Sequence, residues 1–207
     1  MAFIKGASVV RRMAIVAFAG LTLALTGCAS YYVDGATKEI ASSSYRKPAT
    51  AQPVQVFFEF QTKGVPNAAA TKLLKEQVVQ KVKDSGLFSR VEEAPVPGGA
   101  VLSVKLNNVP MSDDAFSQGF VTGLTFGLAG SKVSDGFICT VNYIADGQKT
   151  TVTKTARHAI HTTLGVASSP GQARKAESIK EAVSQMTSQI LSTALNDLSQ
   201  DAAFAGQ

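Results

Sequence analysis

Apolar and polar residues alternate along several stretches of this chain, and that alternation predicts β-strands. Every second position is apolar in residues 54–61 and again in residues 102–106, as expected when one face of a strand is buried. Two longer runs, residues 137–145 and 150–164, show a similar pattern. Asp146-Gly147 lies between these two runs and is typical of a hairpin turn, so we expect the runs to pair antiparallel.

A longer period, with apolar residues three or four positions apart, predicts two helices. In the first helix, Leu74, Val78 and Val82 recur every four residues. Asn67 is suited to cap the start of this helix, and Gly86 is suited to end it.

The second predicted helix is long, amphipathic and close to the C-terminus. Ser169-Pro170 offers an N-cap and a proline suited to the first turn. The apolar residues that trace one face of this helix are Ile179, Val183, Met186, Ile190, Ala194 and Leu198. A stripe of this kind is expected to cover the sheet.

Together these elements predict an α+β fold, with a single domain over residues 53–200 and a C-terminal tail over residues 201–207. We expect a largely antiparallel sheet of about five strands, packed against the early helix and the long C-terminal helix. In element order, and in residues 85–91 (SGLFSRV), the chain resembles small periplasmic domains of envelope lipoproteins, including the curli-secretion lipoprotein and the amino-terminal domain of TolB. The resemblance implies support of assembly or transport rather than catalysis.

The N-terminal residues have the layout of an export signal. Basic residues precede an uncharged apolar stretch at residues 13–25, and small residues then lead to Cys28. Leu25-Thr26-Gly27-Cys28 resembles the lipobox of bacterial lipoproteins, where signal peptidase II cuts before a cysteine that carries diacylglycerol. The resemblance implies that residues 1–27 are a lipoprotein signal peptide and that Cys28 is the lipidated first residue of the mature chain.

Two other interpretations of this leader fit less well. Its apolar stretch of 13 residues is shorter than the roughly 20 residues that cross a bilayer as a helix. An ordinary secretory signal would end in an Ala-x-Ala-like site. Ala29 follows the cysteine, where an aspartate in lipoproteins of enteric bacteria implies retention in the inner membrane. By that resemblance, we expect the anchor to lie in the outer membrane. We also expect the domain to face the periplasm, a side of the membrane that Ala29 does not specify.

The segment after the leader is expected to be a tether. Residues 28–52 comprise the lipidated cysteine and a stretch rich in serine, alanine and threonine, with no helical or strand period over a useful length. A chain of this composition behaves as a flexible coil. The tether would let the domain stand away from the membrane.

Charge and cysteine content argue against a nucleic-acid-binding protein and against a domain with an internal disulfide. The formal net charge of +5 owes much to the leader, which carries Lys5, Arg11 and Arg12. No clustered basic face is visible, so we expect no nucleic-acid partner. With Cys28 acylated, Cys139 has no partner for an internal disulfide, and it alternates with apolar residues in a predicted strand. We therefore expect Cys139 to be a small buried side chain.

The most unusual internal stretch is a glycine-rich apolar insert at residues 115–131, which carries no charge. On a helix, its glycines would form a groove beside an apolar ridge. The residues of the groove and ridge are Phe116, Gly119, Phe120, Gly123, Leu124, Gly127 and Leu128. We interpret them as a candidate contact with the membrane or with a second copy of the chain. Packing within the domain, or a glycine-rich loop without a helix, is the alternative.

No motif for catalysis or metal binding emerges. His158 and His161 are the histidines of the chain, and on a strand a separation of three sends their side chains to opposite faces. No zinc-ligand spacing, nucleophile elbow, Walker loop or dinucleotide fingerprint is present. We therefore expect no cofactor, no metal and no enzymatic activity.

These observations predict an outer-membrane-anchored lipoprotein that is a non-catalytic binding or assembly component of the envelope. Its expected partner is the lipid bilayer, through acylated Cys28, together with a second copy or an envelope protein complex. The first alternative is an accessory subunit of a transport or secretion complex, in which the insert would be the docking element. The second alternative is a periplasmic hydrolase.

Overall fold

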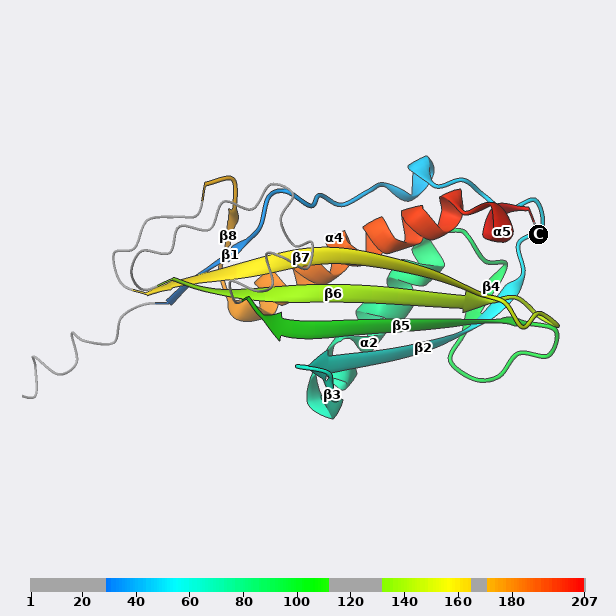
Figure 1. The fold of residues 1–207 in the computed structure, drawn as a ribbon, viewed down its shortest axis with the longest axis horizontal. Helices are drawn as coiled ribbons and strands as arrows, with labels where there is room; N and C mark the ends of the chain where they lie inside the picture. Colours follow the sequence, from blue (N-terminus) through cyan, green and yellow to red (C-terminus); the bar gives the residue numbers. More distant parts are fainter. Residues whose placement is uncertain (1–28, 112–131, 165–170, 207) are drawn as a thin grey trace, which may run out of the picture.

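One mixed sheet forms the body of the protein in a computed structural model, which describes residues 29–111, 132–164 and 171–206. The strands are β1 (Ala29–Val33), β2 (Pro53–Thr62), β3 (Val65–Pro66), β4 (Arg90–Glu92), β5 (Ala100–Pro110), β6 (Lys132–Ile144), β7 (Thr151–Leu164) and β8 (Arg174–Ala176). They lie in the order β3-β2-β5-β6-β7-β1-β8, and β4 pairs with β2 (Figure 1).

The sheet is largely antiparallel, as predicted. Five neighbouring pairs run antiparallel, whereas β2 pairs in parallel with both β4 and β5. β6 and β7 form the expected hairpin, and Gly147 in its turn has a φ of 69°, which a glycine adopts without strain. The sheet has eight strands among the described residues, more than the five or so predicted. The additional strands are short and lack an alternating pattern.

In the described part of the chain, two long helices cover one face of this sheet. They are α2 (Ala68–Asp84) and α4 (Ile179–Gln200), and the short elements η1 (Ser42–Ser44) and α5 (Ala202–Ala205) accompany them. α2 packs on β2, α4 packs on β7, and the two helices contact each other (Figure 1). The observed architecture is therefore a two-layer α+β fold.

The first helix has the boundaries that the sequence predicted. The Asn67 side chain accepts a hydrogen bond from the Ala70 N–H at 3.0 Å, which caps the start. At the other end Gly86 has a φ of 62°, in the left-handed region that ends many helices. Leu74, Val78 and Val82 are all buried.

The second helix begins later than predicted. Its N-cap is Ser178, whose side chain accepts from the Glu181 N–H at 3.1 Å, and the Glu181 carboxylate accepts from the Glu177 N–H at 2.7 Å. This reciprocal arrangement satisfies N–H groups that a helix start leaves unpaired. The predicted start at Ser169-Pro170 was therefore wrong, because β8 lies between that position and the helix.

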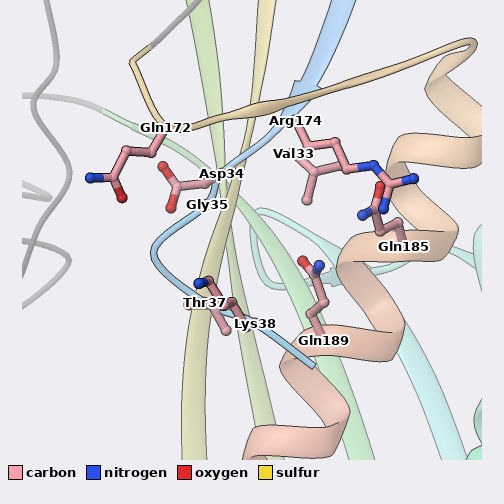
Figure 2. A pocket seen from close by; sticks show the side chains of 9 residues that line it. All are labelled: Val33, Asp34, Gly35, Thr37, Lys38, Gln172, Arg174, Gln185 and Gln189. Atoms are coloured by element: carbon pink, nitrogen blue, oxygen red, sulfur yellow. The ribbon is translucent and has the colours of Figure 1, made fainter. Parts of the chain in front are cut away.

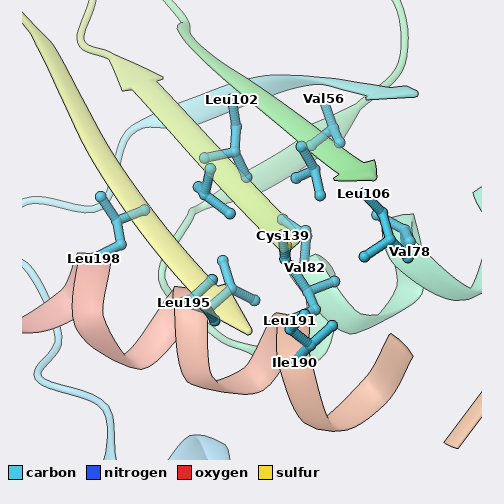
Figure 3. Packing of buried hydrophobic residues seen from close by; sticks show 14 of the residues in the cluster. Val56, Val78, Val82, Leu102, Leu106, Cys139, Ile190, Leu191, Leu195 and Leu198 are labelled. Carbon is cyan, nitrogen blue, oxygen red and sulfur yellow. The ribbon is translucent and has the colours of Figure 1, made fainter. Parts of the chain in front are cut away.

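The core lies between the helices and the inward face of the sheet. Figure 3 shows Leu102 and Cys139 from the sheet facing Val82 and Leu191 from the helices. Cys139 is 1% exposed, and burial raises the pKa of its thiol to about 12. The thiol therefore packs as a small neutral side chain, as its alternation with apolar residues predicted.

The predicted tether over residues 28–52 differs from the structure. Residues Ala29–Val33 are strand β1, which pairs with β7 and β8. The chain then runs along α4 (Figure 1), where the Ile40 N–H donates to Ser192 Oγ at 2.9 Å and the Tyr45 hydroxyl donates to the Ser192 carbonyl at 3.0 Å. Contacts with distant residues order this segment, and local periodicity does not reveal them.

The predicted tail over residues 201–207 also differs from the structure. Asp201 accepts the Ala203 N–H at 2.8 Å and so caps α5. Phe204 of α5 is 2% exposed and reaches the core. The end of the described chain is therefore part of the folded body.

Candidate functional site

A polar cavity of about 380 Å³ lies where β1 ends, beside β8 and α4. This volume falls in the range of small-molecule sites, about 300–1,000 Å³. The residues that line it are Val33, Asp34, Gly35, Thr37, Lys38, Gln172, Arg174, Gln185 and Gln189 (Figure 2). Most of these side chains are polar, whereas most small-molecule sites are lined mainly by apolar groups.

Three separate parts of the chain build the cavity. Residues 33–38 leave the end of β1, residues 172–174 lead into β8, and Gln185 and Gln189 project from α4 one turn apart. At Gly35 the first segment passes very close to the second. A Cβ atom added there would lie 2.1 Å from the Gln172 carbonyl oxygen. Glycine at position 35 is therefore required for the two segments to meet.

The carboxylate of Asp34 is already engaged inside the protein. Its Oδ1 accepts from the Ala36 N–H at 2.7 Å, and its Oδ2 lies 3.2 Å from His161 Nε2. Burial alone would raise the pKa of Asp34, but the hydrogen bond from His161 and that from Ala36 outweigh it and leave the pKa below its ordinary value of 3.8. Asp34 therefore remains an anion at neutral pH.

His161 extends this contact into a hydrogen-bonded row across three strands. His161 on β7 lies opposite Ser134 on β6, and Ser134 Oγ is 2.8 Å from His161 Nδ1. With Nε2–H donating to Asp34, Nδ1 accepts the Ser134 hydroxyl. The row therefore connects β6, β7 and the end of β1, and His161 within it is 6% exposed.

His158 positions a second lining residue from the other face of β7. Its Nε2 lies 2.6 Å from Gln189 Oε1, and its Nδ1 accepts from the Ala159 N–H at 2.8 Å. Burial is the main reason that the pKa of His158 is lowered from 6.5, although the hydrogen bond to Gln189 opposes it. A neutral imidazole therefore donates to the Gln189 carbonyl oxygen and leaves the Gln189 amide group to face the cavity.

The lowered pKa of His158 predicts a loss of stability in mild acid. The unfolded chain binds a proton at His158 as pH falls through 6.5, whereas the folded chain binds it only at lower pH. The free energy of unfolding therefore decreases as pH falls below 6.5. Urea unfolding at pH 7.5 and pH 5 measures this decrease, and we expect His158→Gln to make it smaller. An equal decrease in the variant would contradict the assignment.

The structure describes the two histidines that were considered and rejected as metal ligands, but it describes none of the predicted site residues. His158 and His161 point to opposite faces of β7, as their spacing predicted, and each contacts a residue of the cavity wall. Among the described residues, no three His, Cys, Asp or Glu side chains gather as a metal site requires. Cys28 and the residues of the insert, Phe116, Gly119, Phe120, Gly123, Leu124, Gly127 and Leu128, lie outside the described residues.

Sequence analysis missed the cavity itself. One local signal was present, because Tyr31-Tyr32-Val33 followed by Asp34-Gly35 has the composition of a strand followed by a turn. The glutamines on α4 and Arg174 carry no such signal. Their approach to β1 is a long-range contact that only the folded chain creates.

No protein-family model matches the chain, and no curated protein matches it. Among solved structures, a single-residue variant of the PelC dodecamer from Paraburkholderia phytofirmans aligns with a TM-score of 0.37 and 13% identity, covering 88% of this chain and 99% of that chain. A second PelC dodecamer crystal from that organism aligns with a TM-score of 0.37, 12% identity and coverage of 84% and 100%. A protein from Caulobacter crescentus CB15, provisionally described as a lipoprotein, has a TM-score of 0.29 and 10% identity, with coverage of 72% and 87%. Scores this low do not establish a shared fold, so the lipoprotein prediction stays a prediction.

Proposed function

We propose that this protein is a lipid-anchored, non-catalytic binding component of the bacterial envelope, and that the cavity at the end of β1 is its binding site. The observation that carries the proposal is the position of β1. This strand begins at Ala29, directly after the lipobox-like cysteine, and ends at Val33 and Asp34 in the cavity wall. Five residues at about 3.3 Å each separate the anchor from the cavity.

The end of the sheet where β1 begins suits a lipid surface. Ala29 pairs with Leu164 at the end of β7, and Leu164 remains 45% exposed. Val133, at the beginning of β6, is 56% exposed. Large apolar side chains are thus exposed beside the proposed acylation site. Acyl chains contribute about 0.8 kcal/mol per buried methylene, which is sufficient for stable attachment when two or more are present.

The pairing of β1 gives the anchor a defined geometry. Because β1 bonds to β7 on one side and β8 on the other, the acylated residue is joined to the sheet rather than to a flexible coil. The cavity is then presented at a distance of about 16 Å from the anchor along the strand. Anchoring in the outer membrane, which Ala29 after the cysteine implies, and exposure to the periplasm are both parts of the proposal.

No helix in the described part of the chain is long and apolar enough to cross a membrane.

A hydrolase is the second candidate function, favoured by the row of Ser134, His161 and Asp34. These are the side-chain types of a serine hydrolase triad. In such triads, however, the serine bonds Nε2 and the aspartate bonds Nδ1, and this row has the two nitrogens exchanged. The histidine is also buried between strands. We therefore interpret the row as a structural connection between β1 and the hairpin.

Membrane fractionation of cells that express the chain tests the proposal. We expect the wild-type protein in the outer-membrane fraction and the Cys28→Ser variant outside it, because the serine cannot carry a thioether-linked lipid. Intact mass should show acylation at Cys28 in the wild type. In the same preparation, a fluorophosphonate probe should leave Ser134 unlabelled.

Two results would contradict these expectations separately. An intact mass that shows an unmodified Cys28, or a leader that is still attached, would contradict the proposed lipid anchor. Labelling of Ser134, lost in a His161→Gln variant that still folds, would establish the hydrolase in place of the binding component. Cys139→Ser is the matched control for the loss of a cysteine, since Cys139 lies in the core and cannot affect fractionation through lipidation.

A further inference from the structure

The side chains that line the cavity carry more positive than negative charge that a ligand could contact. Lys38 and Arg174 each bring a positive charge, and Asp34 brings one negative charge. Both oxygens of Asp34 already accept hydrogen bonds, from the Ala36 N–H and from His161. The carboxylate is therefore directed at the protein itself, and the cavity presents a net positive potential to a molecule that enters it.

Among the described residues, the two cations, Lys38 and Arg174, have no ion-pair partner of opposite charge. Figure 2 shows the Arg174 side chain extending from β8 toward Gln185 on α4. A guanidinium in this setting can donate two parallel hydrogen bonds to a carboxylate or phosphate.

The neutral side chains of the cavity are also arranged to donate. The carbonyl oxygen of Gln189 is engaged by His158 Nε2 at 2.6 Å, so the amide NH₂ group is what remains for a ligand. Gln185 lies one turn away on the same face of α4 and can supply a second amide. The cavity therefore combines positive charge with hydrogen-bond donors.

We infer that the cavity binds a small anionic ligand rich in hydroxyl groups, in which a carboxylate or phosphate pairs with Arg174 and Lys38 and the hydroxyl oxygens accept from Gln185 and Gln189. The polar side chains of the lining favour such a ligand over an acyl chain, because a ligand without acceptors would leave these donors unpaired. A soluble sugar acid and the headgroup of an anionic lipid share this chemistry. The inference rests on the proposed binding function and specifies its ligand class.

Calorimetric titration of the acylated mature protein, which begins at Cys28, in phosphatidylcholine nanodiscs tests the inference. The probes are glucuronate, which has a carboxylate beside hydroxyls, inorganic phosphate, and glucose as the uncharged counterpart of glucuronate. We expect glucuronate to bind at least about tenfold more tightly than glucose, because a hydrogen bond to a charged group is stronger than one to a neutral group.

Charge-neutralising variants identify the residues responsible. Arg174→Gln should weaken glucuronate binding by about tenfold or more, and Lys38→Gln should weaken it by a smaller factor because lysine donates as a single point charge. Lys175→Gln is the matched control: it removes the same charge from the next residue of β8, which does not line the cavity. At physiological salt its effect should stay within about twofold.

Nanodiscs that contain phosphatidylglycerol separate the two sources of the ligand. A lowered apparent affinity for glucuronate in these discs would show that the lipid headgroup competes for the cavity. An unchanged affinity would assign the site to a soluble anion. Both results support the shared chemistry of the ligand.

Other outcomes would contradict the inferred ligand class and leave the proposed acylation of Cys28 unaffected. Equal binding of glucose and glucuronate, unaffected by Arg174→Gln, would show a binding site for a neutral ligand. No binding of glucuronate or phosphate at up to about 10 mM would show that the cavity does not select anions. In both cases, the intact mass at Cys28 and the membrane fractionation would still test independently whether the protein is lipid-anchored.

Discussion

Phe204→Ala is expected to lower the free energy of unfolding by about 3–5 kcal/mol, the range for truncation of a buried aromatic residue. Phe204 is 2% exposed although it lies three residues before Gln207, the last residue of the sequence. Its ring packs edge-on against Tyr143 at 4.9 Å and against Phe88 at 5.8 Å between centroids. Removing it leaves a void where three parts of the chain meet.

The measurement is urea unfolding of the wild type and the variant, with the change read from the midpoint at an unchanged m-value. Gln200→Ala is the control, because Gln200 is exposed at the end of α4, and its effect should stay within about 0.5 kcal/mol. A loss below about 1 kcal/mol in Phe204→Ala would mean that α5 does not close the core.

Tyr45→Ala is expected to have an effect of similar size, about 3–5 kcal/mol. Tyr45 is 5% exposed, and its hydroxyl donates to the Ser192 carbonyl of α4 at 3.0 Å. Burial, with a smaller contribution from Glu39, raises the pKa of Tyr45 to about 12, so the hydroxyl remains a donor through the neutral range. The residue fastens the segment between β1 and β2 onto α4.

A pair of variants separates the ring from the hydroxyl. Tyr45→Phe keeps the ring and removes one hydrogen bond, for which we expect a loss of about 1 kcal/mol. Thr50→Ala changes an exposed position of the same segment and should alter unfolding by less than about 0.5 kcal/mol. If Tyr45→Ala were as stable as the wild type, residues 34–52 would behave as part of the tether that the sequence predicted over residues 28–52.

Elements with a strong local signal could be predicted closely. α2 has an asparagine cap, an apolar residue every four positions and a glycine after its last turn, and each of these acts through neighbouring backbone groups. The β6–β7 hairpin combined alternation with Asp146-Gly147 in the turn. In both cases the residues that specify the element lie within the element itself or within a few residues of its ends.

Elements that depend on distant partners could not be predicted in this way. β1 and β8 have five and three residues and gain their order by pairing with each other and with β7. The start of α4 was placed too early because Ser169-Pro170 and Ser178 are both acceptable caps locally, and the pairing of β8 selects the second. A short strand is stabilised by its neighbours in the sheet rather than by its own pattern.

By itself, the sequence determined the α+β class and most of the buried face of each long helix, because these depend on residue order and period. The export leader and the acylation of Cys28 stay predictions from the sequence. Only the tertiary structure decided that residues 29–52 are part of the body, that Phe204 closes the core, and that Asp34, Arg174 and Gln189 surround one cavity. Those features are contacts between residues far apart in the chain, and such contacts form only when the sheet and α4 pack together.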